Sequence, residues 1–257
     1  MTTSASARTQ TERADQTRAR ILDAAVRQFS ASGLAGARTE QIAEEAGVNK
    51  ALLYYYYKSK EELYAAALEV VIESVRADSV NVLEANASAG ERIVQIVLRN
   101  FDRSYCHPSL RTLMQQEMVR LHQGEEHRMA RMAEMFFRPI WDKLEEVLKE
   151  GIASGELISV DPSQMRYAVL GANLNYFLSA PLTRLTLGTD PLERSALEFR
   201  RQKAVEFLGQ AIFIDREHGA RVAQRVLAAT PMPKIKAIDI GSHPTCNKNL
   251  HEPSLKK

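Results

Sequence analysis

Apolar residues recur at helical spacing along most of this chain, and that periodicity limits the possible folds more than any other feature. Ile21, Leu22, Ala25, Val26 and Phe29 are three or four residues apart, which places them on one face of a helix. The alternation of apolar and polar residues that is typical of half-buried strands is nearly absent. The sequence therefore predicts an all-α protein.

Composition limits the class of protein without naming a function. The 257 residues are 45% hydrophobic and 26% charged, as in a soluble globular protein with a substantial core. No apolar run approaches the ~18 residues that a membrane span needs, and the first residues lack the apolar segment of a secretory signal. Cys106 and Cys246 lie far apart, so we expect two free thiols in a cytoplasmic protein. A net charge of +2 neither requires nor excludes a nucleic-acid partner.

Glycines and capping residues divide the N-terminal region into short helices. Gly33 can end the first helix, because glycine readily takes the left-handed conformation. Thr39 can cap a second helix that ends at Gly47, and Asn49 can cap a third through the four tyrosines that follow. The sequence SKEE, residues 59–62, is a capping box that opens a fourth helix. Two short helices joined by the glycine turn AGVN make a helix-turn-helix, whose second helix can enter the major groove of DNA.

This region resembles the DNA-binding domain of the TetR family of bacterial transcriptional regulators. The similar segments are RARILDAAVRQFSASG and RTEQIAEEAGVNKALLYYYYKSKEELY, which together cover about residues 17 to 64. The resemblance implies a homodimer that binds a palindromic operator, usually to repress transcription. It also implies that a C-terminal helical domain binds a small, mostly apolar ligand that releases the protein from DNA. The family's four-helix dimer interface would be formed by the apolar helices of residues 161–215.

The residues of the third helix divide by the direction in which they point. A helical wheel places Leu53 and Tyr57 toward the core, whereas Ala51, Leu52, Tyr54 and Tyr55 point away from Leu53. The resemblance puts five positions at the DNA surface, and Tyr55 joins them because it points outward: Lys50, Ala51, Leu52, Tyr54, Tyr56 and Tyr55.

Two further contacts are expected where helices begin. Thr39 and Lys60 lie at helix N-termini, where free amides favour phosphate. The region also carries Glu40, Glu44, Glu45, Glu61 and Glu62, so we expect a DNA-facing surface that bears lysines, with the glutamates turned aside. The family commonly has Ser or Thr at the position of Leu52, so the operator sequence stays open.

The rest of the chain predicts longer helices and few breaks. Prolines mark their starts or bends at Pro108, Pro139, Pro162, Pro181 and Pro191. The predicted organisation is a flexible arm in residues 1–14, a helix-turn-helix domain in 15–62 with its motif at about 38–57, a helical regulatory and dimerisation domain in 63–229, and a disordered tail in 230–257.

Methionines and aromatic residues suggest where a ligand would bind. Five of the eight methionines lie between Met114 and Met135, and methionine adapts to irregular apolar shapes. Such a cluster is the default pattern of a core, and in a ligand sensor it is also a candidate pocket wall with a few polar anchors. The candidate residues are Tyr105, Met114, Glu117, Met118, Arg120, Met132, Phe136, Trp141, Asn173 and Tyr176.

Patterns of enzymes and metal sites are missing from the sequence. It has no phosphate-binding glycine loop, no GxSxG, no HExxH and no CxxC. His122 and His127 are five residues apart, which fits a helical metal pair poorly, and we expect no metal and no cofactor. Two alternatives stay open: a TetR-like activator, and a helical small-molecule-binding protein or enzyme whose N-terminal bundle is merely structural.

Overall fold

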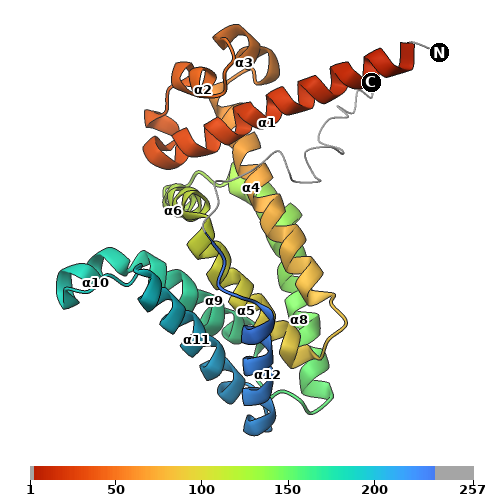
Figure 1. The fold of residues 1–257 in the computed structure, drawn as a ribbon, viewed down its shortest axis with the longest axis vertical. Helices are drawn as coiled ribbons and strands as arrows, with labels where there is room; N and C mark the ends of the chain where they lie inside the picture. The colour runs from red at the N-terminus through yellow and green to blue at the C-terminus, as the bar shows by residue number, and fades with distance from the viewer. Residues whose placement is uncertain (1–2, 235–257) are drawn as a thin grey trace. The chain divides into compact units, whose positions relative to one another are not determined.

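The computed structural model describes residues 3–234, and these residues are helical except for connecting segments and one isolated bridge between Leu157 and Phe213 (Figure 1). The all-α expectation is therefore confirmed. The helices are α1 (Thr3–Gly36), α2 (Thr39–Glu45), α3 (Lys50–Tyr56), α4 (Lys60–Leu83), α5 (Ala89–Cys106), α6 (Pro108–His122), α7 (His127–Met132), the π-helical turn η1 (Ala133–Phe137), α8 (Arg138–Ala153), α9 (Pro162–Leu178), α10 (Ala180–Leu187), α11 (Arg194–Ala211) and α12 (Arg216–Ala229).

The described chain forms two compact units. The first unit contains residues 3–75 and 108–133, and the second contains residues 76–107 and 134–234. This division differs from the boundary expected at residue 62, because α6 packs on α1 and so joins the N-terminal helices.

The first unit is organised around α1, on which both α2 and α6 pack. Phe29 of α1 and Tyr64 of α4 are fully buried, and their rings meet edge to face with centroids 4.9 Å apart. Ile42 and Leu53 bring α2 and α3 into the same core, and both side chains are 0% exposed. The predicted stripe on residues 21–29 is buried as well, which explains why this segment forms the helix that the others cover.

Most of the expected caps of these short helices are present. The side chain of Asn49 accepts a hydrogen bond from the Leu52 amide at 2.7 Å, and the Ser59 hydroxyl accepts one from the Glu62 amide at 3.0 Å. The return bond of the capping box goes from the Lys58 amide to Glu62, at 2.9 Å, and not from the amide of Ser59. The cap expected at Thr39 is wrong by one residue: Arg38 occupies the N-cap position and its side chain makes no capping bond, while Thr39 is the first residue of α2.

The N-terminal segment differs from the expected flexible arm. Helix α1 begins at Thr3, so residues 3–14 are helical. Alanine, arginine, glutamine and glutamate are good helix formers, and a polar composition alone does not stop a helix that is anchored further along. Residues 235–257 of the expected disordered tail, with Cys246, lie outside the described residues.

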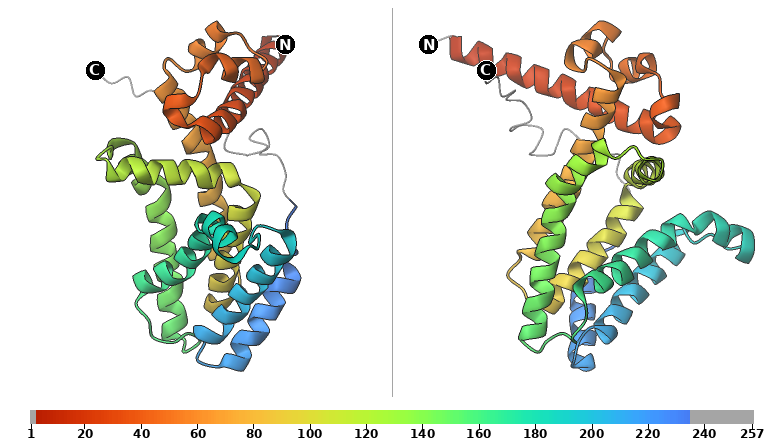
Figure 2. Two further views of the ribbon diagram at one scale, coloured as in Figure 1. Left: turned by 90° about the vertical axis from the view of Figure 1, so that its left-hand side faces the viewer. Right: turned by 180° about the vertical axis from the view of Figure 1, so that it is seen from behind.

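The second unit is built around α5, on which α8, α9, α11 and α12 pack (Figure 2). Its core includes fully buried Ile93, Val94 and Leu148, and Phe213 enters it from the loop between α11 and α12. The Asp161 side chain caps α9 by accepting a bond from the Gln164 amide at 3.0 Å, as the Asp-Pro pair predicts. Helix α12 has no proline at its start that marks it in the sequence; the Asp215 side chain caps it instead.

The prolines act as expected in most places. The turn η1, where the helix widens to π geometry, lies directly before Pro139, and Pro181 lies in the first turn of α10. The break between α9 and α10 is therefore where Pro181 predicts it. The helix expected at Pro191 begins slightly later, at Arg194.

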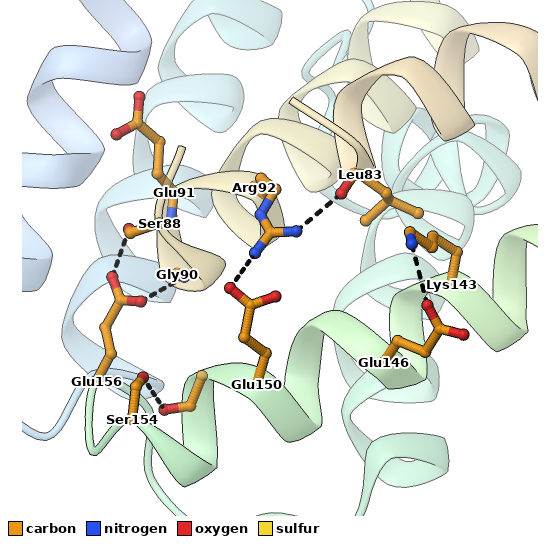
Figure 3. Close-up of polar contacts among 11 residues, drawn as sticks. Leu83, Ser88, Gly90, Glu91, Arg92, Lys143, Glu146, Glu150, Ser154 and Glu156 are labelled. Carbon is orange, nitrogen blue, oxygen red and sulfur yellow. Dashed lines mark hydrogen bonds and ion pairs between the residues drawn. The ribbon is translucent and has the colours of Figure 1, made fainter. Parts of the chain in front are cut away.

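Charged side chains fasten the start of α5 to its neighbours (Figure 3). The Glu156 carboxylate accepts bonds from the Ser88 hydroxyl at 2.6 Å and from the Gly90 amide at 3.0 Å, so it satisfies part of the open end of α5. Arg92 is buried and donates to the Leu83 carbonyl at 3.0 Å and to Glu150 at 2.5 Å. These bonds tie the end of α4, the start of α5 and the end of α8 together.

Helices α11 and α12 approach until their backbones touch. A Cβ at Gly209 would lie 2.6 Å from the carbonyl oxygen of Gly219, and a Cβ at Gly219 would collide with the Gly209 carbonyl and with Phe213. Only glycine at both positions permits this distance between the helices.

Replacing Gly219 by alanine is expected to lower the free energy of unfolding by about 1–3 kcal/mol, because the helices must separate around the methyl group. Urea denaturation followed by circular dichroism measures this loss. A Gly219→Ala protein as stable as the wild type would contradict the close packing described.

Candidate nucleic-acid interface

The helix-turn-helix consists of α2, a turn at residues 46–49, and α3. Gly47 has φ 65°, the left-handed value that the tight turn requires. Leu53 is 0% exposed and Tyr57 is 6% exposed, so the predicted core positions of the third helix are confirmed. These two side chains hold α3 on the bundle and leave its remaining residues toward solvent.

The candidate contact residues of α3 lie on this solvent-facing part. Lys50 and Ala51 are exposed, and Leu52 and Tyr56 are half-buried. Tyr54 is 37% exposed and Tyr55 is 81% exposed, which is unusual for side chains of this size. The Tyr55 and Tyr56 rings meet edge to face at 5.5 Å, and the guanidinium of Arg18 on α1 lies 5.8 Å from the Tyr56 ring. Large amphipathic groups gathered on a solvent-facing helix indicate a contact surface.

A polar network joins α2 to α3 beside this surface, and its central residue, Thr39, is buried at 6% exposure. The Thr39 hydroxyl lies 3.2 Å from the Tyr54 hydroxyl and 3.5 Å from the Glu40 carboxylate. Glu40 forms an ion pair with Lys50, and the Lys50 ammonium lies 5.8 Å from the centre of the Tyr54 ring. Three candidate residues, Thr39, Lys50 and Tyr54, are thus brought together.

The glutamates do not all turn aside as expected. Glu40 pairs with Lys50, whereas Glu45 pairs with Arg27 of α1 and Glu62 caps α4. The hydrogen bond from Lys50 lowers the pKa of Glu40, and the same bond raises the pKa of Lys50, so both groups are charged at neutral pH. The Glu40–Lys50 pair could not be predicted from the sequence, because its residues are ten positions apart on two helices and only i,i+3 and i,i+4 pairs follow from spacing within one helix.

Lys60 occupies the first position of α4, as expected, and also bonds within the protein. Its ammonium donates to the carbonyl of Ala35 at 3.1 Å, which ties α4 to the end of α1. The side chain is half-buried, so it has less freedom than Lys50 to reach a ligand.

The ligand candidates in the first unit are mainly engaged in packing. Glu117 is 0% exposed and accepts a hydrogen bond from the buried Tyr64 hydroxyl at 2.7 Å. Arg120 lies 3.6 Å from Glu117 and 5.7 Å from the Tyr64 ring. Met132 is buried, Met114 is half-buried, and Met118 is 42% exposed. Glu117 therefore serves the protein's own core.

Two ligand candidates of the second unit, Tyr105 and Tyr176, lie in the same aromatic cluster. Tyr105 and Tyr176 pack on the buried residues Phe101, Phe177 and Leu197. The Tyr176 hydroxyl donates to the Pro191 carbonyl at 2.5 Å, and burial raises the pKa of this tyrosine.

The remaining candidates of this unit have different surroundings. Asn173 is buried and donates to the Val97 carbonyl at 3.0 Å. Phe136 is buried as well, whereas Trp141 is 41% exposed with the Arg166 guanidinium 4.4 Å from its ring centre. The ten candidates thus divide between the two units.

The part of the chain that the structure describes offers neither a metal site nor a membrane span. Residues 3–234 contain no group of three or more His, Cys, Asp and Glu side chains arranged to hold a metal ion. No helix in that range is long and apolar enough to cross a membrane. Cys106 is a free thiol, and burial raises its pKa.

Comparison with known proteins places this helix-turn-helix in a family. Residues 21–67 match the profile of "Bacterial regulatory proteins, tetR family", and residues 90–208 match that of "Tetracyclin repressor-like, C-terminal domain". The HTH-type transcriptional repressor NicS of Pseudomonas putida is 30% identical over 169 residues, which are 66% of this chain and 78% of NicS. This chain belongs to the TetR family. It is a transcriptional regulator, and its helix-turn-helix is the family's DNA-binding element.

Solved structures of TetR-type regulators share the fold. A putative regulator from Saccharomonospora viridis in complex with choline superposes with a TM-score of 0.62 at 18% identity, over 76% of this chain and 97% of that chain. FadR from Bacillus subtilis in complex with stearoyl-CoA gives a TM-score of 0.58 at 21% identity, over 74% and 96% of the two chains. At these identities the likeness shows the fold alone.

Tyr64→Phe is expected to lower the free energy of unfolding by about 1–3 kcal/mol, because the buried Glu117 loses its hydrogen bond from the Tyr64 hydroxyl. Tyr55→Phe makes the same chemical change on a side chain that is 81% exposed, so its stability should match that of the wild type. Chemical denaturation of the three proteins at neutral pH checks this. If Tyr64→Phe is as stable as the wild type, the bond to Glu117 contributes nothing.

Proposed function

We propose that this TetR-family regulator is a repressor that binds a palindromic operator as a homodimer and is released by a small, mostly apolar effector. The surface formed by α3 supports the DNA contact, because it joins a cation, hydroxyls and exposed rings on a short helix fixed by Leu53 and Tyr57. Repression, and not activation, is favoured because the relative NicS is named a repressor.

The chemistry of each α3 side chain determines whether we expect it to contact bases or phosphates. Lys50 can donate to guanine or phosphate, and Ala51 and Leu52 can contact a thymine methyl group. Tyr54 and Tyr56 carry hydroxyls that can bind phosphates and fix the register without reading sequence. Tyr55 lies on the same surface, whereas Thr39 and Lys60 add contacts at the starts of α2 and α4.

Exposed apolar side chains support a homodimer through residues 161–215. On α9, Tyr167, Leu174 and Leu178 are 66%, 50% and 55% exposed and lie on one helical stripe. On α11, Phe199 and Phe207 are 64% and 71% exposed. Large apolar side chains exposed in this number mark an interaction site, and a second copy placed by a two-fold axis would cover both helices symmetrically.

An effector is supported by the family and by the aromatic side chains of the second unit. Tyr105 and Tyr176 stand beside Phe101 and Phe177, a wall that fits an apolar or aromatic molecule. The similar structures from S. viridis and B. subtilis hold choline and stearoyl-CoA, respectively. An effector that favours one arrangement of the protein can change DNA affinity by ~1–3 kcal/mol, which is enough to empty an operator.

Footprinting on the DNA that flanks the protein's own gene tests the proposal. We expect a protected palindrome whose half-sites are one or more helical turns apart. A thermal-shift screen then supplies effector candidates, because a ligand at ~100 times its dissociation constant adds about 2.7 kcal/mol to stability. An effector found in this way should remove the protection. Absence of any protected palindrome would support the alternative, a small-molecule-binding protein or enzyme with a structural N-terminal bundle.

Phe207→Glu is expected to weaken the dimer by about 2 kcal/mol or more, roughly 30-fold in the dissociation constant, because it places a charge on an apolar contact. Analytical ultracentrifugation measures the change. Val119→Glu on α6 introduces the same charge at a residue that is 57% exposed and outside the proposed interface, so it should leave the dimer intact. A Phe207→Glu protein that dimerises as tightly as the wild type would place the interface elsewhere.

A further inference from the structure

An acidic residue, Glu40, lies within the surface that is proposed to contact DNA. Its side chain is 60% exposed and pairs with Lys50, whose side chain is 53% exposed. A carboxylate at this position repels phosphate and neutralises the one lysine at the start of the recognition helix. The Glu40–Lys50 pair lowers the affinity for any DNA sequence. Its role therefore cannot be to strengthen binding.

Glu40 belongs to a closed ring of four side chains from two helices. One carboxylate oxygen pairs with Lys50, and the other lies 3.5 Å from the Thr39 hydroxyl. That hydroxyl lies 3.2 Å from the hydroxyl of Tyr54, and the Tyr54 ring is 5.8 Å from the Lys50 ammonium. Glu40 thereby favours one position of the Lys50 side chain, which is otherwise free to take several rotamers.

The Glu40–Lys50 pair is expected to change the affinity for DNA more than the stability of the fold. Ion pairs between exposed side chains contribute little to stability, because water and salt screen them. Non-specific affinity for DNA, in contrast, depends directly on the number of phosphates that free cations neutralise. While Lys50 is paired with Glu40, its charge attracts phosphate less on any sequence, and its remaining N–H groups can still donate to a base edge in the groove.

We propose that Glu40 is a specificity-determining positioning residue: it holds Lys50 against Tyr54 and suppresses phosphate contact with arbitrary duplex DNA. Discrimination between the operator and other DNA then rests on base contacts from α3. This inference depends on the proposed operator binding and adds to it a role for an acidic residue of α2.

Glu40→Gln tests this role without a large change in shape. Affinities of the wild type and the variant are measured for the footprinted operator and for a random duplex of equal length, at several salt concentrations. With Lys50 released to a phosphate, the random duplex should be bound about fivefold more tightly at ~0.15 M salt, and the slope of log affinity against log salt should steepen by about 0.9. The operator should gain less, so the ratio of operator to random affinity falls.

Two further variants distinguish the loss of the Glu40–Lys50 pair from the loss of any one negative charge on α2. Glu44→Gln removes the same charge from an exposed residue of the same helix that lies outside the ring, and it should leave the ratio unchanged. With Lys50→Gln present, adding Glu40→Gln should no longer steepen the salt dependence. Unfolding of the Glu40→Gln protein should match the wild type, so a purely structural role would not produce the shift.

The possible results have distinct meanings. An unchanged salt slope in Glu40→Gln, or an equal change on both duplexes, overturns the role of Glu40 while the operator proposal stands. A wild-type protein that binds operator and random DNA equally overturns the operator proposal itself, and the Glu40 inference with it.

Discussion

The attachment of α3 through Leu53 and Tyr57 is the contact on which the function of this protein depends. A helix of seven residues is far too short to be stable alone in water, so its conformation comes from the core against which it packs. Leu53 is fully buried, and Asn49 satisfies a free amide at the helix start. The buried side chains of Leu53 and Tyr57 therefore hold the solvent-facing side chains of α3 in place. A mutation that disrupts this core would weaken DNA recognition without touching a DNA-contacting residue.

Patterns within one helix could be predicted from the sequence, and contacts between helices could not. The 21–29 stripe, the Asn49 and Asp161 caps, the break at Pro181 and the inward position of Tyr57 all follow from local spacing or from the chemistry of single residues. Thr39 shows the limit: its residue type suits a cap, but the N-cap position falls on Arg38, and the Thr39 hydroxyl turns to Tyr54.

The candidate sites illustrate the same limit. Glu117 looked like a polar anchor in a methionine-rich helix, yet its partner is a tyrosine 53 positions earlier. Glu40 looked like a charge to be turned away, yet it pairs across the turn with Lys50. In both cases the tertiary neighbour decides what an acidic residue does. Burial and charge alone do not distinguish a ligand anchor from a structural carboxylate.

The glycine contact between α11 and α12 has a consequence for assembly. Where two helices touch through side chains, a new rotamer can absorb a small change, but two backbones in contact have no such freedom. Backbone atoms therefore set how closely α11 approaches α12, and even a methyl group would move them apart. Phe199 and Phe207 lie on α11, so the geometry of any assembly formed through them is set by two residues that have no side chains at all.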